Sequence, residues 1–177
     1  MINSLDLVRD QIKHARENFI GTTSDVTQEM LHVDPGAKAL PLGATWAHVI
    51  FTEDMIIHNM LRKQLALYET SFQNNTGVSM PMPPLDSQWN EANELWSKTV
   101  RITLPELLEY QEAVFSDTDK YIMNLHDDEF DAELDLGTWG KKRVWYILYE
   151  MVASHMNSST GEISVLKGLQ GVRGFPY

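Results

Sequence analysis

Hydrophobic side chains recur every three or four positions in four long segments of the chain, which is the spacing of one face of an α-helix. These segments begin near Ser4, near Leu42 or Gly43, near Thr103 and near Lys141, and the last extends to about Leu169. The second segment is apolar on two sides, which indicates a helix buried among others. The pattern therefore predicts four main helices packed around a common core.

Polar residues at the starts of these segments are suited to helix capping. Ser4 is a suitable N-cap for the first main helix, and Ser24 for a short helical piece that follows it. Thr103 and Glu106 have the spacing of a capping box, with Pro105 in the first turn of the third main helix.

The longest connection lies between the second and third main helices. Residues 70–87 are rich in Pro, Asn, Ser and Gly, and residues 87–100 have the pattern of a short helix. The acidic stretch 126–140 is expected to be a solvated loop, and no convincing strand pattern occurs. We expect an all-α fold: a four-helix bundle with a long crossover between main helices two and three, plus short extra helices, as one domain over residues 1–177.

The net charge of the chain limits the classes of partner that it is expected to bind. Fourteen Lys and Arg residues stand against 25 Asp and Glu residues, a formal net charge of −11 with a pI near 4.8. Cationic side chains drive most binding to nucleic acids and to anionic membranes, so we expect neither partner. The one dense basic cluster, Gly140–Arg143, is interpreted as the solvated start of the last helix.

The residue types present also limit the chemistry. The chain has no cysteine, so a transition-metal site would need His, Asp, Glu and water as ligands. The N-terminal segment carries charges throughout and lacks the apolar core of a signal peptide. No run approaches the roughly 18 apolar residues of a membrane helix, and we expect a cytoplasmic location.

Two histidines stand on helix faces that are expected to point into the bundle. His48 belongs to the second main helix and His155 to the fourth, where Ser159 and Glu162 follow His155 at i+4 and i+7 on the same face. Metal sites in bundles are built from side chains that project inward on facing helices. The polar face formed by His155, Ser159 and Glu162 is thus a metal site, the remnant of one, or a buried hydrogen-bond cluster.

The other polar candidates have weaker arguments. Glu162 has three open roles: a metal ligand, an acceptor for the second N–H group of a histidine, or a structural residue. His58 lies ten residues beyond His48, about 15 Å along a helix, which is too far to share an ion. The remaining histidines, His14, His32 and His126, lie in polar surroundings and suggest no site.

Two segments, "WAHVIFTEDMIIHNML" and "SHMNSSTGEISVLKGLQGVRGFPY", resemble the DinB superfamily of YfiT-like metalloenzymes. The resemblance covers nearly the whole chain in helix order and length. Its most specific part is the pattern H-x5-G-E-I-x2-L-K-G-x-Q-G, from His155 to Gly171. It implies a four-helix bundle with a crossover, a homodimer, and a divalent zinc or nickel ion held by one His of helix two and a His-x3-His of helix four.

Carried over by position, the resemblance gives this chain an incomplete ligand set. His48 matches the ligand of helix two and His155 the first ligand of helix four, but Ser159 occupies the second position of helix four. A serine hydroxyl is a poorer zinc ligand than imidazole, so a zinc or nickel ion is expected to be bound weakly or not at all.

Three functional hypotheses follow. The first is a DinB-like protein with an incomplete metal site and a residual pocket for a small-molecule ligand. The second is a divalent-metal-dependent enzyme, such as a thiol-dependent S-transferase or a hydrolase, that uses His48 and His155 with a substitute third ligand. The third is a structural bundle without a pocket. The sequence indicates neither a substrate nor catalytic residues.

Overall fold

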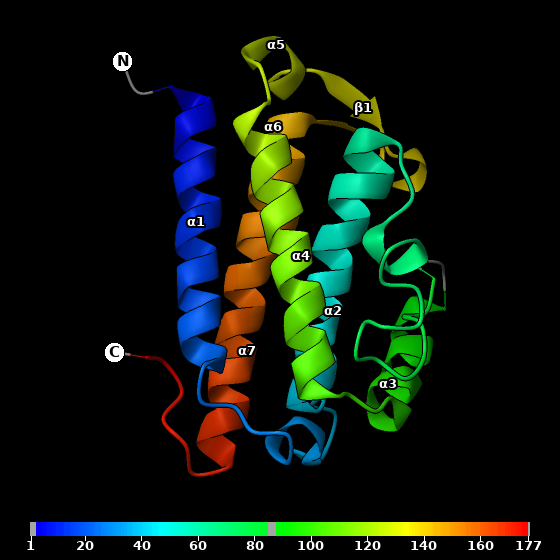
Figure 1. Ribbon diagram of the computed structural model, residues 1–177, viewed down its shortest axis with the longest axis vertical. Coiled ribbons are helices and arrows are strands. Elements are labelled where there is room, and N and C mark those ends of the chain that lie inside the picture. The colour runs from blue at the N-terminus through cyan, green and yellow to red at the C-terminus, as the bar shows by residue number, and fades with distance from the viewer. Residues whose placement is uncertain (1–2, 85–87, 177) are drawn as a thin grey trace.

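Four long helical segments make up the computed structural model, which describes residues 3–84 and 88–176. They are α1 (Ser4–Thr23), α2 (Leu42–Asp54) continued by η2 (Met55–Arg62), α4 (Leu104–Met123), and a last segment composed of α6 (Val144–Tyr146), η5 (Ile147–Ser154) and α7 (His155–Leu169). Figure 1 shows them side by side along the long axis of the molecule. The predicted helical bundle is confirmed.

The order and direction of the helices confirm the predicted crossover as well. In Figure 1, α1 and α7 run downward while α2 and α4 both run upward, so α2 and α4 are parallel. Parallel neighbours need a connection that returns the chain to the starting end. This connection contains η3 (Leu67–Glu69) and α3 (Trp89–Thr99), and α3 corresponds to the short helix predicted for residues 87–100.

The acidic stretch predicted as a solvated loop is instead structured, and that prediction is wrong. It contains α5 (Asp127–Phe130), β1 (Glu133–Asp135), η4 (Gly137–Trp139) and β2 (Lys141–Arg143). The two strands pair antiparallel as a small hairpin, and the last long helix therefore begins at Val144 rather than Lys141.

Charged side chains stabilise this hairpin. Lys141 lies 3.5 Å from Glu133, its near neighbour across the strands, and Arg143 lies 2.6 Å from Asp131. Both ion pairs are exposed to solvent, which screens the charges, so each contributes at most ~0.5 kcal/mol. Gly140 has a positive φ of 70°, a conformation that favours glycine, at the turn between the strands.

Helix capping also differs from the sequence-based expectation. The N-cap of α1 is Asn3, whose side chain accepts a hydrogen bond from the Leu5 N–H at 2.9 Å, so Ser4 is the first helical residue. Thr103 does stand at the N-cap of α4, but its side chain makes no capping hydrogen bond, and the capping box with Glu106 is not formed. The piece expected from Ser24 reduces to one turn, η1 (Met30–His32).

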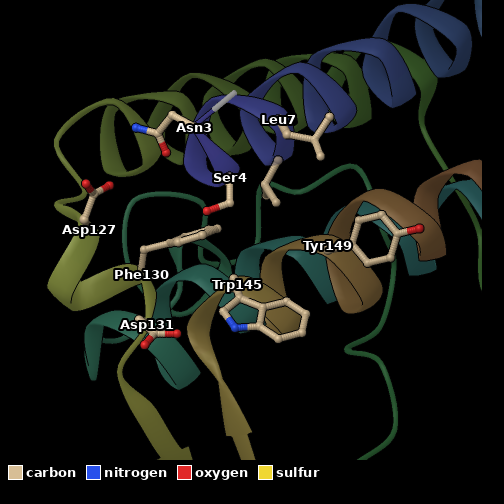
Figure 2. A pocket seen from close by; sticks show the side chains of 9 residues that line it. Asn3, Ser4, Leu7, Asp127, Phe130, Asp131, Trp145 and Tyr149 are labelled. Atoms are coloured by element: carbon tan, nitrogen blue, oxygen red, sulfur yellow. The ribbon is translucent and has the colours of Figure 1, made fainter. Parts of the chain in front are cut away.

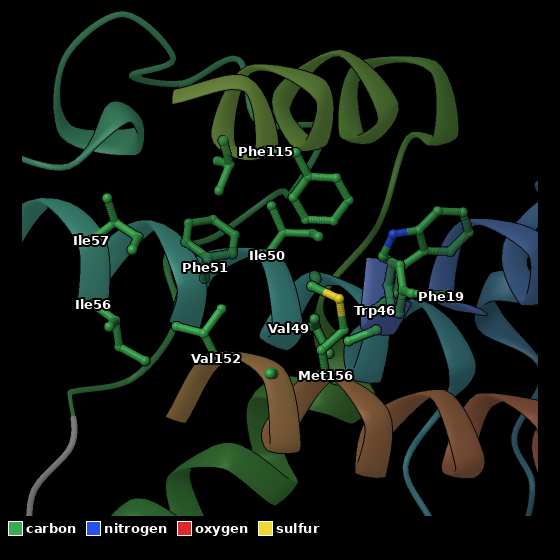
Figure 3. Close-up of a cluster of buried hydrophobic side chains, with 14 of the residues drawn as sticks. Phe19, Trp46, Val49, Ile50, Phe51, Ile56, Ile57, Phe115, Val152 and Met156 are labelled. Atoms are coloured by element: carbon green, nitrogen blue, oxygen red, sulfur yellow. The ribbon is translucent and has the colours of Figure 1, made fainter. Parts of the chain in front are cut away.

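The buried apolar side chains form one continuous cluster between the four long segments. Figure 3 shows Phe19, Trp46 and Phe115 meeting inside it, and the Phe19 ring contacts both of the others edge to face, at centroid distances of 6.0 and 6.4 Å. The indole N–H of Trp46 donates to Gln111 at 2.7 Å, which satisfies a polar group inside the core. Among the described residues no helix is both long and apolar enough to cross a bilayer.

Two segments of the bundle are π-helices rather than α-helices. They are η2, which continues α2, and η5, which precedes α7, and they contact each other across the bundle. A π-helix hydrogen-bonds from i to i+5, so each turn takes up more residues than an α-helical turn, and such segments are rare and often occur at functional sites. The helical spacing of the sequence did not reveal them.

A buried polar network joins η2 to α4, away from the other histidines. His58 is 3% exposed and contacts both Asp54, at 2.7 Å, and Asp117, at 2.8 Å. Burial lowers the pKa of His58, but hydrogen bonds to the two aspartates outweigh this effect, so its pKa is raised. Asp54 also accepts hydrogen bonds from the Tyr110 hydroxyl and the Leu67 N–H, which makes it the centre of the network.

Replacing His58 with Gln tests the charge of this network. Because folding raises the pKa of His58, the protonated side chain stabilises the protein fully below about pH 6.5, and this contribution is lost as pH rises through the folded-state pKa. We expect His58→Gln to lower the free energy of unfolding by ~3 kcal/mol at pH 6, and by less at pH 9. Urea unfolding at both pH values measures the difference, with His14→Gln, at an exposed position, as the control. An equal loss at pH 6 and pH 9 would contradict a charged His58.

Candidate functional site

The structure brings His48 of α2 and His155 of α7 into direct contact. Their Nε2 atoms are 3.1 Å apart, and their rings meet edge to face with centroids 5.0 Å apart. The residues that follow the two histidines in the sequence, Val49 and Met156, are fully buried in the core. The core packing of the two helices therefore sets the positions of both imidazoles.

Both imidazoles favour the neutral form. Burial, with a smaller contribution from His155, lowers the pKa of His48 to about 4, and burial also lowers the pKa of His155. A contact between two ring nitrogens requires one donor and one acceptor, which two neutral imidazoles can provide and two imidazolium ions cannot. Neutral imidazole is also the form that binds metal ions.

Residues from the long crossover connection cover His48 from outside. Its Nδ1 atom lies 3.3 Å from the Met82 sulfur, and its ring centroid lies 5.6 Å from that of Trp89 at an interplanar angle of 39°. Thus the first turn of α3 and the chain before it form one wall of the site, although they are more than 30 residues from His48 in sequence.

The histidine pair lines a pocket of about 390 Å³. The π-helical segments supply much of its lining: Met55 and Ile56 come from η2, and Glu150, Met151 and Ser154 come from η5. Trp89, from α3, and Trp139, from the turn of the β-hairpin, also line it. An apolar concavity with a few convergent polar groups is the usual form of a small-molecule site.

Ser159 and Glu162 are not among the residues that line this pocket. Ser159 is buried at 5% exposure, and the hydroxyl that does face the pocket from α7 belongs to its neighbour, Ser158. Glu162 is exposed and lines a separate cavity of about 530 Å³. The pocket extends from His155 toward η5, whereas Glu162 lies about 10 Å along the helix in the other direction.

The described residues provide only two of the donors that the resemblance implies. Among residues 3–84 and 88–176, no group of three or more His, Cys, Asp or Glu side chains is placed to hold a metal ion. The pair of imidazoles alone does not fit the four-coordinate geometry that holds zinc tightly in proteins, where at least three ligands come from the chain.

The sequence pattern indicates that His48 and His155 face each other, but it does not indicate the other side chains that line the pocket. The sequence pattern predicts a short helix around Trp89 and a solvated loop around Trp139, and it assigns neither residue to a site. The one available signal for Trp139 was its occurrence in an otherwise acidic, glycine-containing stretch, because so large an apolar side chain seldom lies fully exposed in a loop. Glu150 and Ser154 gave no comparable signal.

A larger pocket, of about 600 Å³, lies at one end of the bundle, and no histidine lines it. Figure 2 shows it between the first turn of α1, which contributes Ser4 and Leu7, and the start of the last helical segment, which contributes Trp145 and Tyr149, with Phe130 between them. Size does not make it the better candidate, because two histidines with lowered pKa values line the smaller pocket and are in direct contact there.

These features define a helical bundle with a crossover and a two-histidine pocket. The sequence profile of the DinB superfamily matches residues 11–157, and the chain belongs to this superfamily. The matched range includes His48 and His155 and ends before Ser159. A crystal structure of a conserved protein from Enterococcus faecalis has a similar fold, with a TM-score of 0.74 and 15% sequence identity over 96% of this chain and 98% of that chain. No curated protein matches the sequence.

The ionisation of His48 can be measured directly. We expect its imidazole to titrate with a pKa of about 4, well below a free imidazole in the same sample. Between about pH 6.5 and 4 the folded protein then binds fewer protons than the unfolded chain, so stability is lost as the pH falls through this range. NMR of the imidazole Cε1–H signals gives the pKa, and His48→Gln assigns the resonance. If His48 instead titrates at the same pH as free imidazole, the histidine pair is solvated and ionised and the expectation is wrong.

Proposed function

We propose that this DinB-superfamily protein binds a small molecule in the pocket at His48 and His155, and that its metal site lacks the third ligand. The observation that supports the proposal is the direct 3.1 Å contact between the two Nε2 atoms, in a pocket that no third metal-binding side chain among the described residues completes. In this arrangement each imidazole serves as the hydrogen-bonding partner of the other.

This contact opposes metal binding in a specific way. A metal ion needs a lone pair from each Nε2 atom, but one of the two nitrogens carries the proton of the shared hydrogen bond. Metal binding would therefore require a change of tautomer and the loss of a buried hydrogen bond, and the ion would gain only two ligands from the protein. Two imidazoles without a third donor make a weak site, and the Ser159 hydroxyl replaces an imidazole poorly.

The alternative is a divalent-metal-dependent enzyme, such as a thiol-dependent S-transferase or a hydrolase, with a substitute third ligand. The structure changes which residue would be the substitute. Glu150 lines the same pocket as the two histidines, whereas Glu162, considered first from the sequence, lines a different one. A carboxylate is an acceptable zinc ligand, so Glu150 is the residue on which this alternative depends.

Replacing Ser159 with His tests the missing-ligand proposal. Side chains on a helix lean toward its N-terminus, so an imidazole at position 159 leans toward His155, one turn earlier. We expect Ser159→His to bind zinc at one ion per chain and at least ~100-fold more tightly than the parent, equivalent to about 3 kcal/mol. Competition titration with a chelating dye and elemental analysis after dialysis measure affinity and stoichiometry.

Asn157→His is the matched control, because it adds a histidine to an exposed position of the same helix. This control should not raise zinc affinity. Parent protein that retains one zinc or nickel ion per chain after dialysis would overturn the proposal and favour the metal-dependent enzyme. In that case Glu150→Gln should release the ion, whereas Glu162→Gln should not.

The homodimer implied by family membership is a separate prediction, which light scattering over a range of concentrations tests.

A further inference from the structure

We propose that the histidine pocket takes a planar aromatic ligand that is uncharged or positively charged, held against Trp89 and Trp139 with its charged end toward Glu150. This inference rests on the proposed function, because it names the class of small molecule that the same pocket binds. Three observations support it: the aromatic walls, the sign of the charge at the rim, and the source of the outer wall.

The walls favour an aromatic ring. Trp89 lies against His48, and Trp139 lines the same pocket from the hairpin turn. Aliphatic and thioether side chains from Met55, Ile56 and Met151 line the same pocket. Aromatic rings gain binding free energy from stacking or edge contacts beyond the area they bury, and a thioether contact with a ring adds to this gain.

The charges around the pocket favour a neutral or cationic ligand over an anionic one. No Lys or Arg side chain occurs among the described residues that line it, and Glu150 is its one charged side chain there. Glu150 is exposed and forms no ion pair within the described residues.

The basic residues nearest in sequence to Trp139 have other partners. Lys141 pairs with Glu133, Arg143 pairs with Asp131, and the Lys142 ammonium lies 5.3 Å above the ring of Tyr146. The cluster interpreted from the sequence as a solvated helix start is thus engaged in holding the hairpin. An incoming carboxylate or phosphate would find no unpaired cation there, whereas an ammonium group would find the Glu150 carboxylate and the tryptophan faces.

The outer wall depends on the hairpin. Trp139 is 41% exposed and belongs to η4, the turn between β1 and β2. An exposed tryptophan that closes one side of a cavity has a clear use if a ligand covers it, because the ring then loses its contact with water. The hairpin thus presents an aromatic surface to the pocket in addition to joining α4 to the last helical segment.

Three ligands that share an indole ring but differ in charge test the inference. They are tryptamine, a cation, indole, which is uncharged, and indole-3-acetate, an anion. We expect tryptamine to bind about 10-fold more tightly than indole-3-acetate, a difference of about 1.4 kcal/mol, with indole between them, because the exposed Glu150 carboxylate attracts the cation and repels the anion. Isothermal titration calorimetry of the full chain at pH 7 measures the three affinities, and repeating it at high salt should reduce the difference.

Two pairs of variants locate the effect. Trp139→Ala should weaken the binding of all three ligands by roughly 5-fold or more, whereas Trp145→Ala, a similarly exposed tryptophan at the separate 600 Å³ pocket, should not. Glu150→Gln should bring the affinities of tryptamine and indole-3-acetate together and leave that of indole unchanged. Glu162→Gln, at an exposed carboxylate of another cavity, should leave all three affinities as they are.

The outcomes separate this inference from the proposed function. If indole-3-acetate binds as tightly as tryptamine, or if Trp139→Ala weakens binding no more than Trp145→Ala, the assigned ligand class is wrong. If none of the three ligands binds while Ser159→His still gains zinc, the ligand class falls and the missing-ligand proposal stands. If the ligands bind as expected but the parent holds a stoichiometric metal ion, the ligand class stands and the missing-ligand proposal falls.

Discussion

Val49 and Met156 are buried at the packing contact between α2 and α7, and each stands next to one of the two histidines in sequence. Because neighbouring side chains on a helix point in different directions, burying these two residues turns His48 and His155 toward the edge of the same contact. The imidazoles then meet half-buried, between the core and the solvent. The pocket, the lowered pKa values and the access of a ligand all depend on this placement.

The helix that carries His48 is also the most heavily connected part of the bundle. Its inner face enters the apolar core through Trp46 and Ile50, while Glu53 forms a buried ion pair with Arg16 of α1. Asp54, one residue further, holds the network with His58 and Tyr110. Buried ion pairs contribute little net stability, but breaking one is costly, so they hold a single arrangement of the helices. Helix α2 therefore keeps its position while the surface around it is free to vary.

The sequence was sufficient for the bundle, the crossover and the two facing histidines, because each of these depends on helical spacing over many residues. It was insufficient where the spacing changes. The π-helical segment η5 alters which side chains before His155 share its face, so that Glu150 lines the pocket. In the regular helix α7, Ser158, three residues after His155, lines the pocket, whereas Ser159 and Glu162 do not. It was also insufficient at Trp139, because the three-residue strands that position this side chain are too short to produce an alternating pattern.

The pocket has two kinds of wall, and they differ in how freely they can evolve. Its floor, the histidine pair, is tied to the core, where most substitutions cost stability. Trp89 and Trp139 come instead from the crossover connection and a hairpin turn, which belong to the parts of a protein that tolerate substitution and insertion best. Substitutions in these outer segments can therefore change the shape and chemistry of the pocket without repacking the four long helices of the bundle.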